Sequence, residues 1–171
     1  FVSYSSIILA CRGKPVLVKL KESEDFKIDP NSIRNSITKK TKAIIINSPH
    51  NPTGAVLDKK RIKEIYDICE EHDIYLLSDE VYGRMIYSDS KSGFHSPSNY
   101  DNCLKRTVLI HSLSKTYAMT GWRIGAVTGP ESLIKRMSLL FETITSCVPP
   151  FIQIAAIEAM KNSTKYSYDM I

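Results

Sequence analysis

Short runs of consecutive apolar residues recur along the chain and alternate with segments of helical spacing. The apolar runs predict strands at residues 15–20, 43–46, 74–77, 107–111 and 124–128. Uninterrupted apolar runs are typical of strands that are covered on both faces of a parallel sheet. The pattern therefore predicts an α/β fold of three layers, α/β/α, built on a mainly parallel sheet.

Helices are predicted between the strands by residues that favour a helix start. Asp29 and Pro30 suit the start of a helix that runs to about residue 37. Asp58 has a capping role before residues 62–69, whose apolar side chains recur at helical spacing. The remaining predictions are a helix from 130–132 to 141, a helix from 149–150 onward, and an exposed polar loop at 88–102.

Three polar residues each follow a predicted strand by a few positions. Asn51 follows the strand at 43–46, Asp79 follows the next strand, and Lys115 follows the one after that. Ligands bind outside the carboxyl ends of parallel strands, so these residues are expected at one edge of the sheet. Arg123 precedes its strand, and it reaches the same edge only if that strand runs antiparallel. The sequence thus predicts a mixed sheet whose last strand is antiparallel.

Composition narrows the classes of function. The chain has 171 residues, which suits one domain with a core of its own. Its net charge of +5 comes from scattered basic residues with acids between them, which indicates a solvated surface rather than a nucleic-acid site. No apolar run is long enough to span a membrane.

The cysteines and histidines do not predict a metal site. The four cysteines form no CxxC pair, and their wide spacing predicts free thiols in a reducing compartment. The four histidines show no ligand spacing either, and we interpret them as structural or exposed.

Lys115 is the candidate nucleophile. A lysine amine attacks an aldehyde only when neutral, and its ordinary pKa is about 10.4. Burial, or a nearby cation such as Arg123, lowers that pKa and makes the amine reactive. Most lysines lie on the surface, and only the neighbouring motifs make the catalytic interpretation the stronger one.

Asp79, Tyr82 and Asn51 suit an aromatic nitrogen heterocycle. A carboxylate at position 79 can pair with a protonated pyridine nitrogen, although Glu80 is equally suited on chemistry alone and aspartates are common in turns. The Tyr82 phenol and the Asn51 amide can donate hydrogen bonds to a ring oxygen. Packing by Tyr82 and turn formation by Asn51 are the ordinary alternatives.

Ser112, Ser114 and Arg123 suit a phosphate. The serine hydroxyls can donate hydrogen bonds, and the guanidinium can bind phosphate through two N–H groups. Turn formation and a surface ion pair are the alternatives. Phe1 can stack on a ring. An amine, an acid, a phenol, an amide and a guanidinium together fit pyridoxal phosphate, an aldehyde that carries a ring nitrogen and a phosphate.

Three motifs, taken in order, resemble those of the class I/II aminotransferases. These are fold-type I pyridoxal-phosphate enzymes, and the likeness is to bacterial and archaeal aspartate aminotransferases. The motifs are residues 47–54, residues 78–82, and residues 112–115 followed by 121–123. Each motif alone is weak evidence, whereas their order and spacing are specific. The resemblance extends over essentially the whole chain.

The resemblance implies a role for each candidate residue. Lys115 forms a Schiff base with the cofactor, and Asp79 faces the pyridine nitrogen. Asn51 and Tyr82 contact the ring oxygen. Ser112 and Arg123 bind the phosphate, and Phe1 stacks on the ring. The implied enzyme is a cytoplasmic homodimer that exchanges an amino group between an amino acid and a 2-oxo acid.

The resemblance also implies that residues 1–171 are a partial large, cofactor-binding domain of the fold of these transferases. The N-terminal segment and the C-terminal small domain of such enzymes are absent from this chain, so the isolated chain is expected to be inactive. Two alternatives stay open. One is a carbon–sulfur lyase or decarboxylase on the same scaffold, and the other is a non-enzymatic ligand-sensing domain of a transcription regulator.

Overall fold

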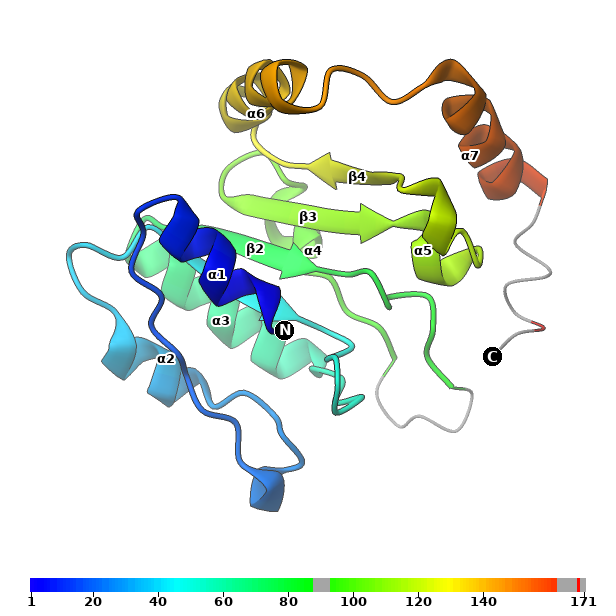
Figure 1. Cartoon of the computed structure of the whole chain (residues 1–171). Coiled ribbons are helices and arrows are strands. Elements are labelled where there is room, and N and C mark those ends of the chain that lie inside the picture. The colour runs from blue at the N-terminus through cyan, green and yellow to red at the C-terminus, as the bar shows by residue number, and fades with distance from the viewer. Residues whose placement is uncertain (88–92, 163–168, 170–171) are drawn as a thin grey trace.

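A four-stranded sheet forms the centre of the computed structural model, which describes residues 1–87, 93–162 and 169 (Figure 1). The strands lie in the order β1-β2-β3-β4. β1 pairs with β2 and β2 with β3 in parallel, whereas β3 and β4 are antiparallel. This arrangement confirms the predicted mixed sheet with an antiparallel last strand. The strands are β1 (Ala43–Asn47), β2 (Tyr75–Asp79), β3 (Thr107–Ser112) and β4 (Gly125–Thr128).

Helices lie on both faces of the sheet, which gives the predicted α/β/α layers (Figure 1). α1 lies on one face and α3 on the other. In chain order the helical elements are α1 (Ser3–Ala10), η1 (Glu22–Glu24), α2 (Pro30–Ser36), α3 (Lys59–Glu71), α4 (Ser98–Asp101), α5 (Leu113–Thr116), η2 (Thr120–Trp122), α6 (Glu131–Ile144) and α7 (Pro150–Asn162).

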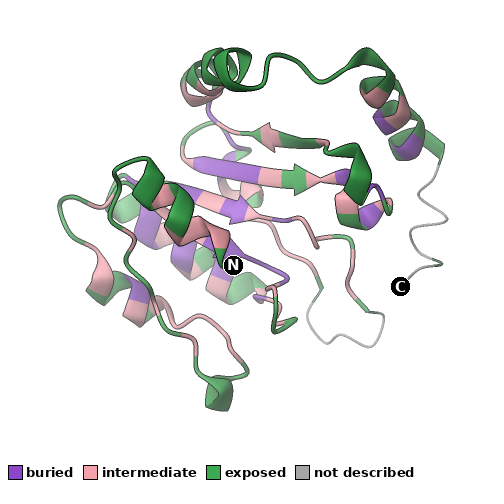
Figure 2. Cartoon of the chain, viewed as in Figure 1, coloured by how far each residue is buried: buried purple, intermediate pink, exposed green. Residues whose placement is uncertain are grey.

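The main core lies between α3 and the sheet. The Asp58 carboxylate accepts a hydrogen bond from the backbone N–H of Arg61 at 2.8 Å, which confirms Asp58 as the helix cap. Ile65 and Cys69 on the inner face of α3 are fully buried, and they belong to one apolar cluster with Leu76 of β2. Burying a side chain of this size stabilises the fold by about 1.5–3 kcal/mol. Figure 2 shows this buried layer between α3 and the strands.

The strand predicted at residues 15–20 is wrong. This segment pairs with no strand among the described residues, and its Val16 and Leu17 side chains are exposed. A cavity of about 510 Å³ is lined by residues of this segment and of β1, and among the described residues no backbone hydrogen bond joins the two. An apolar run forms a strand only where a neighbouring strand can pair with it.

The exposed loop predicted at residues 88–102 is wrong in part. Residues 88–92 lie outside the described part, and the end of the segment forms the short helix α4. Asp101 of α4 is buried, and its carboxylate accepts hydrogen bonds from the backbone N–H groups of Arg106 and Thr107, each at 3.0 Å, which offset the cost of its burial. These bonds hold α4 against the start of β3.

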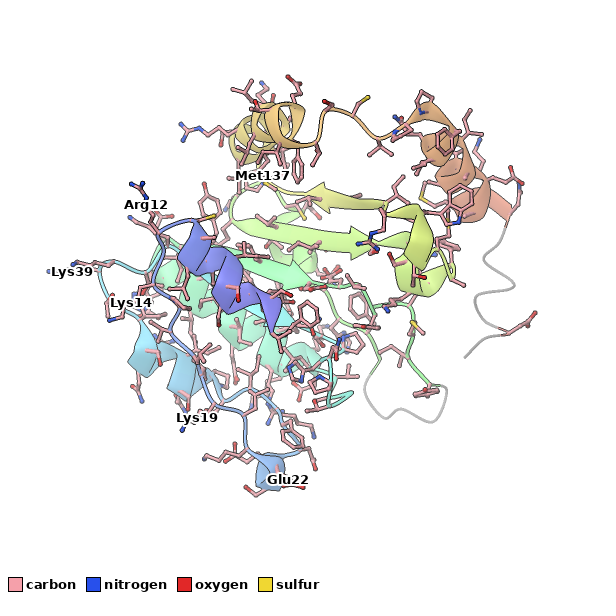
Figure 3. The ribbon with its side chains drawn as sticks, in the orientation of Figure 1. Arg12, Lys14, Lys19, Glu22, Lys39 and Met137 are labelled. Carbon is pink, nitrogen blue, oxygen red and sulfur yellow. The ribbon has the colours of Figure 1, made fainter. Side chains whose placement is uncertain are left out.

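α6 and α7 are largely exposed (Figure 2), and their exposed residues include the large apolar residues Leu139, Phe141 and Phe151. α7 buries Ala156 and Ala159, which pack with Leu113 and Met119. None of the described helices has the length and apolar character needed to cross a membrane. Figure 3 shows four exposed basic side chains on the side of the molecule that carries α1 and α2, those of Arg12, Lys14, Lys19 and Lys39.

Candidate functional site

The carboxyl ends of β1, β2 and β3 meet at one edge of the sheet, and the predicted site residues gather there. Asp79 is the last residue of β2, and Asn51 lies in the turn after β1. Lys115 lies in α5, which begins directly after β3. The antiparallel register places the start of β4 beside the end of β3, so Arg123, just before β4, reaches the same edge.

The structure distinguishes the two neighbouring carboxylates that the sequence left open. Successive side chains of a strand point to opposite faces. Glu80, a residue that is 5% exposed, lies on the α3 face, where its carboxylate accepts a hydrogen bond from the Ser78 hydroxyl at 3.0 Å. Asp79 lies on the α1 face, where it accepts a hydrogen bond from the Tyr4 hydroxyl. Only Asp79 therefore shares a face with α1.

Tyr4 is a site residue that the sequence analysis missed. Its hydroxyl donates to Asp79 Oδ2, and the second carboxylate oxygen accepts from the backbone N–H of Val81 at 3.2 Å. Burial first, and then the hydrogen bond and charge of Asp79, hold the pKa of Tyr4 well above its ordinary value. The Tyr4 ring packs edge-on against Phe1, with ring centres 5.7 Å apart. Spacing gave no signal for this bond, because its partners are 75 residues apart.

Tyr82 links two further candidates. The Asn51 side-chain amide donates to the Tyr82 hydroxyl at 3.3 Å, and the backbone N–H of Asn51 donates to Asn47 Oδ1 at 2.9 Å. The Lys115 Nζ lies 6.0 Å from the centre of the Tyr82 ring, at the outer limit of a cation–π contact. The structure thus brings together Asn51, Tyr82 and Lys115.

Ser112 and Arg123 lie at the same edge but bond to their own neighbours. The Ser112 hydroxyl accepts from the backbone N–H of Ser114 at 3.1 Å, and so caps α5. The Arg123 guanidinium donates to the backbone oxygen of Thr120 at 2.8 Å and is exposed. Because β3 ends and β4 begins at this edge, both residues lie where a phosphate is expected. Among the described residues, no group of three or more His, Cys, Asp or Glu side chains can hold a metal ion.

Comparisons with known proteins place this geometry in a family. The chain is 42% identical to an aspartate aminotransferase of Pyrococcus abyssi, covering 97% of this chain and 42% of that protein. It is 40% identical to aromatic-amino-acid aminotransferase 2 of Thermococcus litoralis, covering 97% of this chain and 42% of that protein. The chain therefore spans less than half the length of these relatives.

Solved structures give the same result. An aromatic aminotransferase from Pyrococcus horikoshii superposes with a TM-score of 0.93 at 42% identity, covering 99% of this chain and 46% of that one. An aspartate aminotransferase from Thermus thermophilus with maleate superposes with a TM-score of 0.91 at 36% identity, covering 99% and 43%. The model of the family "Aminotransferase class I and II" matches residues 1–170. The chain therefore belongs to the class I and II aminotransferase family.

Proposed function

We propose that the protein transfers an amino group between an amino acid and a 2-oxo acid with pyridoxal phosphate as its cofactor. One observation carries the proposal: the amine of Lys115, the bonded pair Asn51–Tyr82 and the carboxylate of Asp79 stand at one edge of the sheet. The relatives are named as aspartate and aromatic aminotransferases, which supports the class of reaction.

The side chains present fit this cofactor. Lys115 would bond to its aldehyde, and Asp79 would pair with its ring nitrogen. Asn51 and Tyr82 would donate to its ring oxygen. Phe1 would stack on the ring, and Ser112 and Arg123 would bind the phosphate. When bound, the cofactor supplies an electron sink for the charge left on the α-carbon of the substrate.

Proton transfer falls to Lys115. Its Nζ removes the α-proton of the substrate and later returns a proton, so one amine serves as both base and acid. The Tyr82 ring lies beside this amine, with its centre 6.0 Å from Nζ. Asp79 stays oriented through this exchange, because Tyr4 and the backbone of Val81 each donate to one of its oxygens.

We further propose that residues 1–171 are part of a large, cofactor-binding domain. The share of the relatives' length that the chain covers, 42%, supports this division. An N-terminal segment and a C-terminal small domain would then complete the enzyme. The homodimer and the cytoplasmic location stay predictions.

Reductive labelling tests the assignment of Lys115. The complete gene product is mixed with pyridoxal phosphate, reduced with borohydride, digested and mapped by mass spectrometry. We expect the label on Lys115, its loss in Lys115→Ala and its retention in Lys135→Ala, which changes an exposed lysine of α6. A label confined to another lysine refutes the assignment. Stoichiometric oxo-acid exchange supports transfer, whereas release of ammonia or carbon dioxide supports a lyase or a decarboxylase.

A further inference from the structure

The segment before α4 lies against the turn that follows β2, on the face away from Asp79. The Ser96 hydroxyl donates to Glu80 Oε1 at 2.7 Å, and the Ser78 hydroxyl donates to the same oxygen at 3.0 Å. The Phe94 ring packs on Gly83, where an added Cβ would lie 3.0 Å from the ring. Two separate contacts therefore hold this turn.

The turn carries Tyr82. The backbone N–H of Gly83 donates to the Glu80 carbonyl oxygen at 2.8 Å, and the N–H of Met85 donates to the Tyr82 carbonyl oxygen at 2.8 Å. Glu80 therefore fixes one end of the turn through its backbone, while its side chain is fixed by Ser96. A change at Ser96 reaches Tyr82 through two hydrogen bonds and one short piece of backbone.

Because the Glu80 carboxyl is buried, losing its hydrogen bond from Ser96 costs free energy. Burial is the largest influence on the Glu80 carboxyl, and it raises the pKa of that group. The two serine hydroxyls oppose this effect, as does His111 of β3, whose Nε2 lies 3.9 Å from Glu80 Oε2, whereas Asp79 adds to it. A buried carboxyl that loses a hydrogen-bond donor must find another, so the turn moves when Ser96 loses its hydroxyl.

We propose that Ser96 and Glu80 are positioning residues that hold the Tyr82 phenol in place beside Asn51 and Lys115. The inference rests on the proposed function, because it concerns the same site. The Asn51–Tyr82 hydrogen bond is already long at 3.3 Å, so a displacement of a few tenths of an ångström breaks it. The phenol then donates less well to the ring oxygen of the cofactor.

A spectroscopic titration of the complete, cofactor-loaded gene product tests the proposal. The readout is the pH midpoint of the visible absorption band of the cofactor. We expect Ser96→Ala to raise this midpoint by about 0.5 pH unit, the order expected when one hydrogen bond weakens. The midpoint rises because a ring oxygen with weaker donors holds a neighbouring proton more firmly. Ser96→Thr retains the hydroxyl and restores the midpoint, and Asn99→Ala, an exposed site in α4, leaves it unchanged.

Hydrogen exchange of the cofactor-free protein supplies a second readout. Peptides that cover residues 81–87 should exchange about threefold faster in Ser96→Ala, whereas peptides from β1 should not change. Should Ser96→Ala fail to fold, Phe94→Leu loosens the other contact of the turn and shifts both readouts in the same direction.

The outcomes separate the two proposals. A wild-type protein with labelled Lys115 and an unchanged midpoint in Ser96→Ala overturns the positioning role and leaves the proposed function intact. Absence of the Lys115 label in the wild type overturns the proposed function. In that case the hydrogen-exchange rates of residues 81–87 still test the role of Ser96. Equal rates in wild type and Ser96→Ala overturn that role.

Discussion

Tyr4→Phe removes one hydroxyl from α1 and with it the hydrogen bond to Asp79. Hydrogen bonds to charged groups contribute about 1.5–3 kcal/mol to stability. Both side chains are half-buried, so solvent screens the bond and the lower end of this range applies. We therefore expect the free energy of unfolding, measured in urea at pH 7, to fall by about 1.5 kcal/mol. Tyr87→Phe is the matched control, since Tyr87 is 68% exposed, and it should change stability by less than about 0.5 kcal/mol.

The same bond predicts how stability depends on pH. The pKa of Tyr4 in the folded protein lies above its ordinary value of 10.0, so the folded state keeps the phenol proton where the unfolded chain releases it. Above about pH 10 the unfolded state binds fewer protons, and stability falls as the pH rises. The stability difference between wild type and Tyr4→Phe is thus fully present below about pH 10 and shrinks above it. Equal urea midpoints for Tyr4→Phe and Tyr87→Phe at pH 7 would refute the reasoning, as would a difference that persists unchanged at high pH.

Three further changes probe other parts of the structure. Gly125→Ala places a Cβ 2.5 Å from a carbonyl oxygen of β3, and we expect a loss of at least about 2 kcal/mol in urea, whereas Gly121→Ala meets no atom within 4 Å and should cost little. Burial raises the pKa of Cys69 to about 12, so iodoacetamide at pH 8 should label exposed Cys11 and spare Cys69. Labelling of Cys69 in the folded protein contradicts this. Asp79→Ala should lower kcat by about 100-fold or more while most of the cofactor is retained, and unchanged turnover contradicts the role of Asp79.

The strands of the central sheet could be predicted from the sequence because their signal is local. The apolar runs at 43–46, 74–77, 107–111 and 124–128 became β1 to β4, with ends displaced by one or two residues. The antiparallel direction of β4 followed from one chemical demand, that Arg123 reach the edge where the other polar residues lie. These two signals were enough to predict four strands and the direction of β4, whereas the strand order was not predicted.

The errors concern hydrogen-bond partners that a pattern of side chains does not show. Residues 15–20 have the composition of a strand, but composition does not say whether a neighbour is available to pair with them. The end of the segment 88–102 is polar, yet Asp101 is buried, since it satisfies backbone N–H groups that no helix or sheet serves. For residues 15–20 the deciding partner would be another strand, whereas for Asp101 the partners are the nearby backbone N–H groups of Arg106 and Thr107, which a pattern of side chains does not reveal.

The choice between Asp79 and Glu80 needed the structure, because the apolar residues before them lie on both faces of β2. In β2, Leu76 and Ser78 share a face with Glu80, and the apolar inner face of α3 covers that side. A carboxylate on the covered face must be satisfied internally, whereas its neighbour is free to serve a ligand on the other face. Alternation along one strand therefore gives the two acids different environments. Asp79 lies on the α1 face, at the proposed cofactor site, whereas Glu80 bonds to Ser78 and Ser96 on the other face. This division requires the two carboxylates to be adjacent, because only consecutive residues at a strand end can serve both faces at the same level of the sheet.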